Sequence, residues 1–405
     1  MLESSVPAVK PRQSGLFAFI YVALGFFLVV DGFPFVTPSL LSAVIPLLVA
    51  FLAATHLSEI GGAVARIPRL WKWLAFMLLL TTVANDQLTE ALVAAAVFTF
   101  GVIGYVLGRS RVRAEYVRLG LLIGCTLSST VLLIAALGGP DLQATIGSGR
   151  PFWGLSFRST AFSYTAAIGY VLCLSRVFNS DRQRRRYVAM VFCVFFVLAA
   201  TASSSRGGLV AMGLATLFIW ISTARASSRS VRRRRGTTLI AIGTAAVFLL
   251  APTVGLSSGI DRLLRYDEVT LGGSEFSSGR KAAITSAYDL ILSSPVIGHG
   301  TPSLRQDTQQ TLASVPHNGL LQVALRGGIV TMLVALAVIG LALLQASRSV
   351  LHHLAASGIV AVLFVRVFVS SSGPLDSVSL ALLFMLAWAE IRSVNSELRS
   401  NAASE

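Results

Sequence analysis

The chain of 405 residues is 54% hydrophobic and only 13% charged, with a mean hydropathy of +0.75. These values exclude a soluble globular domain and predict a protein that crosses a membrane many times. The formal net charge of +15 does not indicate nucleic-acid binding, because most lysines and arginines fall in alternate loops between apolar runs. We interpret this excess of positive charge as the mark of cytoplasmic loops.

Apolar runs long enough to cross a bilayer as helices recur along the chain. Backbone groups inside a bilayer must be hydrogen-bonded within the protein, so the sequence predicts an all-α helical bundle. Every second run ends at a loop rich in arginine or lysine, which predicts that both termini are cytoplasmic. The expected fold is one integral membrane domain, residues 1–405, with about 12 transmembrane helices at residues 15–30, 38–54, 70–84, 88–107, 116–137, 160–177, 188–202, 208–223, 237–254, 318–344, 354–369 and 375–389.

Neither a metal site nor a cofactor is predicted from the sequence. Cys125, Cys173 and Cys193 all fall within apolar runs and show no metal-ligand spacing, so we expect them to be small core residues. No Asp-x-Asp motif is present and the acidic residues of the outer loops are scattered, which does not indicate a divalent metal.

The longest polar interval, residues 255–316, is expected to form a large, partly helical outer loop between the ninth and tenth spans. Within it, Ser278 is a candidate N-cap of a helix whose apolar residues recur at helical spacing until Pro295 ends it. Arg280 then lies in the first turn, where the helix dipole disfavours a cation. This placement predicts that Arg280 binds an anion.

Five arginines lie on the predicted outer side, against the usual charge bias. They are Arg158, Arg206, Arg280, Arg326 and Arg366. A guanidinium group offers planar, bidentate donors to a phosphate or diphosphate, which is the functional interpretation. The structural alternative is an arginine that extends toward lipid headgroups at the interface.

Two of these arginines have informative neighbours. Arg206 begins an apolar helix, and Gly207-Gly208 beside it lack side chains, so a bulky group could approach closely. Arg366 lies near the outer end of the eleventh span, where Asp376 across the next turn offers a plain ion-pair partner.

His317 directly precedes the tenth span. Histidine is well matched to removing a proton from a sugar hydroxyl near neutral pH, although a histidine at a helix start can equally be an ordinary surface residue. Asn318, Gln322 and Arg326 follow at intervals of four, which predicts a polar stripe on the outer end of that helix. His299, between two glycines, is a weaker candidate for the same role, and a turn residue is the favoured interpretation.

Four sequence elements together resemble the O-antigen ligase and O-antigen polymerase superfamily of bacterial envelope glycosyltransferases. They are Ser205-Arg206-Gly207; Gly279-Arg280 followed by Pro295-Val296-Ile297-Gly298-His299-Gly300; His317-Asn318-Gly319-Leu320-Leu321-Gln322 with Gly327-Gly328; and, more weakly, Arg158-Ser159-Thr160-Ala161-Phe162. The chain departs from the family pattern at Arg326, where the family often has an acidic residue. It departs again at Tyr164-Thr165, where the family often has Pro-Asn.

The resemblance implies that Arg206 and Arg280 hold the diphosphate of a polyprenyl (undecaprenyl)-linked glycan and that His317 activates an acceptor hydroxyl. The other candidate site residues are Arg158 and Arg366 for the diphosphate, and Ser205, Gly207, Asn318, Gln322 and Arg326 as supporting residues. The expected partners are the lipid-linked donor, a glycan or glycolipid acceptor and membrane lipid, without nucleic acid. The expected location is the bacterial cytoplasmic (inner) membrane, with the site on its periplasmic or extracellular face.

The sequence leaves three functions open. A ligase would move a finished glycan to an envelope acceptor, and a polymerase would use the same chemistry with a growing chain; either would invert the anomeric centre in one displacement. A transporter or flippase for lipid-linked sugars is the third possibility. Such proteins often show paired repeats and charges near the bilayer midplane, whereas polarity here is concentrated at the outer edge.

Overall fold

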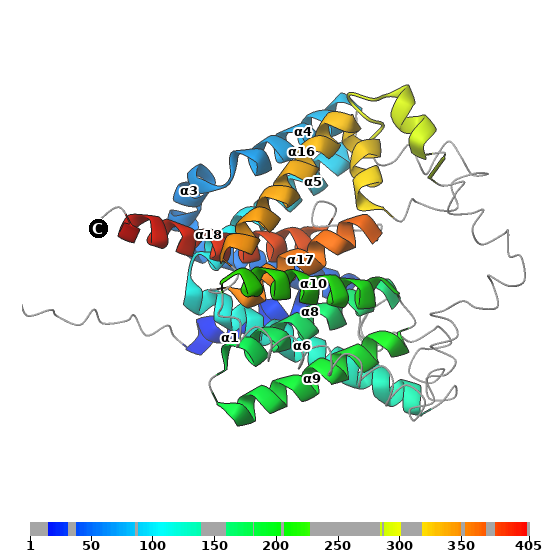
Figure 1. The fold of residues 1–405 in the computed structure, drawn as a ribbon. Helices are drawn as coiled ribbons and strands as arrows, with labels where there is room; N and C mark the ends of the chain where they lie inside the picture. The colour runs from blue at the N-terminus through cyan, green and yellow to red at the C-terminus, as the bar shows by residue number, and fades with distance from the viewer. Residues whose placement is uncertain are drawn as a thin grey trace, which may run out of the picture.

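The computed structural model describes residues 15–30, 38–85, 88–138, 159–180, 182–203, 206–226, 284–285, 287–300, 318–349, 353–369 and 377–402. All regular secondary structure in these ranges is helical, as predicted. The main helices are α1 (Gly15–Phe27), α2 (Pro38–Thr55), α3 (Leu57–Arg66), α4 (Arg69–Ala84), α5 (Leu88–Gly108), α6 (Arg111–Leu137), α8 (Ser159–Asn179), α9 (Gln183–Ala202), α10 (Arg206–Ala226), α16 (Gly319–Ser349), α17 (Leu354–Val369) and α18 (Val378–Ala402). Figure 1 shows the beginning of α1 and the end of α18 on the same side of the bundle.

Five helices in the described part of the chain are long and apolar enough to cross a membrane, or up to six if one bent pair counts as a single span. Shorter apolar helices add Gly15–Phe27, Gly207–Ser222 and Leu354–Phe368. The predicted ninth span, residues 237–254, lies outside the described residues, as does most of the predicted loop 255–316. The membrane-protein class is therefore supported, and the count of about 12 stays a prediction.

The loop predicted after the second span instead contains α3. The segments Ala43–Thr55 and Leu57–Arg66 meet at an angle of 94°. Polar contacts hold this bend, because His56 Nε2 lies 2.8 Å from Tyr21 Oη of α1 and Arg113 of α6 donates to the Glu59 carboxylate at 2.6 and 2.8 Å. The apolar pattern of residues 38–66 alone cannot predict this bend, because Tyr21 and Arg113 belong to other helices.

Close helix pairs in the bundle depend on glycines spaced four residues apart. Gly104 and Gly108 of α5 face the backbone carbonyls of Leu382 and Leu386 in α18, and a methyl group at either glycine would collide with them. Gly120 of α6 meets α1 in the same way. Small residues at this spacing let helix backbones approach closely inside a membrane.

The outside of the bundle carries many large apolar side chains, as a lipid-facing surface requires. Exposed examples are Phe19, Leu47, Trp73, Leu92, Ile123, Leu137, Val191 and Leu333. Cys125, Cys173 and Cys193 are buried and unpaired, in agreement with their predicted role as core residues. Apolar surface of this extent fits a helical membrane protein.

Helix α16 is broken near its beginning. Gly328 has φ 79° and ψ 176°, a backbone conformation in the positive-φ region that favours glycine. In Figure 1 the stretch before Gly328 runs at a steep angle to the rest of α16. The expected tenth span, residues 318–344, is therefore two segments rather than one straight helix.

Candidate functional site

A turn at residues 295–300 is fastened to the break in α16 by backbone hydrogen bonds. His299 N donates to Leu325 O at 2.7 Å, Gly300 N to Arg326 O at 3.2 Å, and Ile329 N to Pro295 O at 2.7 Å. The Pro-x-x-Gly-x-Gly motif and Gly327-Gly328 thus form one structural unit, although almost thirty residues separate them in the sequence.

The glycines of this unit allow backbone conformations with positive φ, and they leave room for the two segments to pack against each other. Gly298 and Gly300 have φ values of 73° and 67°. A Cβ atom on Gly298 would lie 2.6 Å from the carbonyl oxygen of Arg326, and one on Gly328 would lie 2.7 Å from the carbonyl oxygen of Pro295. The two backbones therefore touch directly, and side chains at these positions would separate them.

The helix before the turn also packs on α16. Residues 287–293 are helical and end before Pro295, as predicted. Ala287 and Ile291 are buried against Ala324 and Leu325. This apolar contact and the backbone hydrogen bonds hold residues 287–300 and the first segment of α16 together.

The predicted polar stripe lies on that first segment. The carboxamide oxygen of Asn318 accepts hydrogen bonds from Leu320 N and Leu321 N at 3.0 and 3.2 Å, so Asn318 is the N-cap of α16. Gln322 follows one turn later and is buried, and Arg326, one turn further, is partly buried. The three residues share one helix face, as their spacing predicts.

His299 and His317 differ in their surroundings. His299 Nε2 lies 2.8 Å from Leu290 O and 2.9 Å from Ser293 Oγ, which ties its ring to the end of the preceding helix. This agrees with the prediction of a turn residue. His317 lies outside the described residues, but it is bonded directly to the capping residue Asn318.

A second group of candidate residues meets where α8, α10 and α17 pack together. Arg366 lies over the ring of Tyr164, with its guanidinium carbon 5.2 Å from the ring centroid. Tyr164 is 1% exposed, and its hydroxyl has no hydrogen-bond partner among the described residues. A Cβ atom on Gly207 would lie 2.8 Å from that hydroxyl. Tyr164 thus contacts Arg366 with its ring and Gly207 with its hydroxyl, so Arg366 lies near the beginning of α10.

The space beside Gly207 and Gly208 is occupied by α8. A Cβ atom on Gly208 would lie 2.6 Å from Ser163 Cβ, just as one on Gly207 would meet Tyr164. The absence of side chains here lets α10 approach α8, so a direct substrate contact of Gly207 stays a prediction. Arg206 is the first residue of α10, and its side chain lies outside the described part of the structure, together with all of Arg158, Ser205, Arg280 and Asp376.

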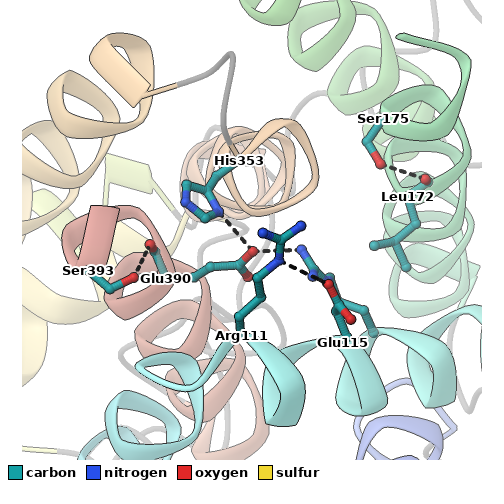
Figure 2. Close-up of polar contacts among 8 residues, drawn as sticks. Arg111, Glu115, Leu172, Ser175, His353, Glu390 and Ser393 are labelled. Carbon is teal, nitrogen blue, oxygen red and sulfur yellow. Dashed lines mark hydrogen bonds and ion pairs between the residues drawn. The ribbon is translucent and has the colours of Figure 1, made fainter. Parts of the chain in front are cut away.

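Sequence reasoning missed a buried charged cluster at the opposite end of the bundle. Glu390 of α18 is 2% exposed, and its Oε1 accepts a hydrogen bond from Arg118 of α6 at 2.6 Å. The same oxygen lies 3.0 Å from His353 Nδ1, and Figure 2 shows this contact between Glu390 and His353. Glu390 Oε2 and His353 Nε2 are buried without a partner among the described residues. Arg118 and Glu390 are 272 positions apart, so no local pattern could reveal the pair.

Groups of three or more metal-ligating side chains are not found in the described ranges. Of the candidate site residues, Asn318, Gln322 and Arg326 lie on the first segment of α16 and Arg366 lies near the end of α17, whereas His317, Arg158, Arg280, Ser205 and the side chain of Arg206 lie outside the described residues. The candidate set predicted from the sequence consists of arginines, amides and a histidine. Such groups can bind an anion and move a proton.

Comparison with known proteins identifies the part of the chain that carries these motifs. Residues 188–336 match the model of the O-antigen ligase family, Wzy_C. The match confirms the relationship to the O-antigen ligase and polymerase superfamily that the motifs predict. It begins within α9, includes α10, the 295–300 turn and the first part of α16, and leaves Arg158 and Arg366 outside. A comparison with curated proteins finds no match.

Proposed function

We propose that the protein is an O-antigen-ligase-like glycosyltransferase. It transfers a glycan from a polyprenyl diphosphate carrier to an acceptor hydroxyl at the outer face of the cytoplasmic membrane. The Wzy_C match supports a ligase-type or polymerase-type transferase in general. The observation that carries the specific proposal is the contact of Arg366, through Tyr164, with the beginning of α10, where Arg206 stands.

The proposed reaction is a single displacement. The acceptor oxygen attacks the anomeric carbon, the bond from that carbon to the diphosphate oxygen breaks, and the diphosphate leaves with the electron pair. His317 takes the hydroxyl proton, and Arg206 and Arg280 stabilise the charge that grows on the leaving group, with Arg366 in support. One displacement inverts the configuration of the anomeric carbon.

The break in α16 gives His317 a fixed anchor in this mechanism. His317 immediately precedes the N-cap Asn318, and the segment that follows is held by backbone hydrogen bonds to residues 295–300. A base attached to a rigid segment can be held close to one geometry, which is the requirement for an efficient proton transfer. The break lies at the beginning of α16 rather than near its middle, so it does not favour the transporter alternative.

The test is release of free polyprenyl diphosphate by the purified, reconstituted protein supplied with a polyprenyl-diphosphate glycan and candidate acceptors. We expect acceptor-dependent release by the wild type and a loss of roughly 100-fold or more in His317→Ala and Arg206→Gln. The matched control is Arg111→Gln, because Arg111 is 84% exposed and pairs only with nearby Glu115 among the described residues. Variants as active as the wild type would refute the site, and transport of the donor without release would support a flippase.

Removal of divalent cations provides a second test of the same mechanism. Guanidinium groups take the place of a metal in neutralising the diphosphate, so we expect glycan transfer to continue in excess EDTA. The measurement is the initial rate before and after chelation, with magnesium added back. A loss of activity that magnesium restores would contradict the proposed role of the arginines.

A further inference from the structure

A half-open cavity of about 1130 Å³ lies between α6, α8 and α9, away from the candidate site, and some of the side chains that line it are exposed. Its walls are mainly apolar, with Leu122, Ile123 and Leu127 from α6 and Val188 and Phe192 from α9. The volume lies just above the range of about 300–1,000 Å³ that is usual for ligand pockets. The cavity is therefore large enough for a sizeable apolar group.

One end of this cavity is strongly basic. Arg176 in the last turn of α8 and Arg182, Arg184 and Arg185 at the beginning of α9 line it. No carboxylate of the described residues lies within the 4.0 Å ion-pair distance of these four arginines. The short connection between α8 and α9 contains a single acidic residue, Asp181, which lies outside the described residues. Most of this positive charge thus has no internal counterion in the described structure.

The beginning of α9 adds to the attraction for anions. The first turn of α9 contains arginines and no acidic residue. Its N-cap residue, Arg182, makes no capping hydrogen bond with its side chain. The positive end of the helix dipole points to this place, where a cation is unfavourable and an anion is favourable. An anion bound here would offset the unfavourable placement of the arginines.

The cavity therefore combines an apolar slot with an anion site at one end, and the positive-inside pattern places that end at the cytoplasmic membrane surface. Basic pockets between transmembrane helices on the cytoplasmic side fit anionic lipid headgroups. We propose that this cavity binds an anionic phospholipid of the inner leaflet, with the phosphate against Arg182, Arg184 and Arg185 and an acyl chain between α6 and α9. This ligand is separate from the donor lipid, which reacts at the opposite end of the bundle.

The test uses the delipidated full-length protein in detergent, titrated with phosphatidylglycerol or with phosphatidylcholine of the same acyl chains. Native mass spectrometry measures the lipid retained. We expect at least tenfold tighter binding of phosphatidylglycerol, and a drop of roughly tenfold or more in the triple variant Arg182→Gln, Arg184→Gln, Arg185→Gln. Thr126→Phe, which places a ring in the slot, is expected to weaken binding while the arginines remain.

The charge-matched control is Arg232→Gln, Arg233→Gln, Arg234→Gln, which removes three arginines from another predicted cytoplasmic loop. This control is expected to bind phosphatidylglycerol as the wild type does. Equal binding of both lipids by the wild type would overturn the proposal, as would equal losses in the two triple variants. A thermal unfolding midpoint near that of the wild type establishes that each variant is folded.

Discussion

The ring of Tyr164 contacts two helices that carry candidate arginines. Its face supports the Arg366 guanidinium and its hydroxyl faces Gly207, next to Arg206. The following residue, Thr165, donates from its hydroxyl to Val29 O at 3.3 Å. These two residues therefore connect α8 with α10, with α17 and with the residues after α1.

Gly207→Ala tests whether this contact positions Arg206. The new methyl group would lie 2.8 Å from Tyr164 Oη, so either the buried Tyr164 ring or the beginning of α10 must move. We expect glycan transfer to fall roughly 10–100-fold, because a small displacement of a binding group is costly to catalysis. Adding Tyr164→Phe removes the nearest colliding atom and is expected to restore part of the rate.

The control for this prediction is Gly213→Ala on the same helix, because a Cβ atom there meets nothing within 4 Å. Its rate should equal that of the wild type. Failure of Tyr164→Phe to restore any activity would show that the collision is not the cause of the loss.

Substitution of the two histidines should separate structure from chemistry. His299→Ala removes contacts with Leu290 O and Ser293 Oγ, so we expect a lower thermal unfolding midpoint and a free energy of unfolding lower by about 1 kcal/mol. Its turnover should stay within about threefold of the wild type, whereas a missing general base costs about 10²–10⁴ in rate. Comparable losses of turnover in His299→Ala and His317→Ala would contradict the assignment of the base.

At the scale of single elements, the unit formed by residues 295–300 and α16 depends on Gly328. Gly328→Ala places a side chain at φ 79° and against the Pro295 and Val296 carbonyls. We expect a loss of about 1–3 kcal/mol in the free energy of unfolding, because this backbone conformation is essentially restricted to glycine, and a loss of glycan transfer. Thermal unfolding in detergent and the transfer assay measure the two effects.

Gly340→Ala is the matched control on the same helix, since a Cβ atom there meets nothing within 4 Å. Alanine in a helix interior is favoured over glycine by up to about 1 kcal/mol, so this variant should be as stable as the wild type or slightly more stable. Equal behaviour of the two variants would contradict the special role of Gly328.

The bend between α2 and α3 should make stability depend on pH. Burial, followed by the nearby Arg113 charge, lowers the pKa of His56 below its usual value of about 6.5. Hydrogen bonds from Arg113 are the largest cause of the lowered pKa of Glu59. Both pKa values are lower in the folded than in the unfolded protein, so both contributions are lost on acidification, first from His56 below pH about 6.5 and then from Glu59 below about 4.5.

The measurement is the thermal unfolding midpoint between pH 4 and pH 8. We expect the midpoint to fall as the pH falls from 7 toward 5, and His56→Gln to flatten this part of the curve. A midpoint that rises on acidification, or an unchanged slope in His56→Gln, would contradict the expectation.

For the molecule as a whole, Glu390 joins α6 and α18 with the residue before α17. Glu390→Gln leaves Arg118 without its buried counter-charge, and breaking a buried pair in this way costs roughly 3–5 kcal/mol. Replacing both partners, as Arg118→Met with Glu390→Leu, should recover most of that loss. The exposed pair of Arg111 and Glu115 offers a control, since Arg111→Gln should change the unfolding free energy by less than about 1 kcal/mol.

The sequence predicts most helices because hydrophobicity and the positive-inside rule act locally along the chain. The predicted span 354–369 coincides with α17, and the predicted span 88–107 with α5 to within one residue. The break at Gly328 and the bend before α3 were not predicted, because contacts with distant segments stabilise both of them. The face shared by Asn318 and Gln322 follows from helical spacing, whereas the contact of Arg366 with Tyr164 depends on packing and could not be predicted from the sequence.

The hydrogen bonds between Gly300 and Arg326 and between His299 and Leu325 join the two ends of residues 301–324 at one place. These hydrogen bonds join main-chain atoms, so they do not depend on which side chains the residues between them carry. Doubling the length of a loop costs only about 0.6 kcal/mol in closure entropy. A change in the number of residues between Gly300 and Asn318 would therefore leave these main-chain hydrogen bonds in place, and the first segment of α16 would keep its position against residues 295–300.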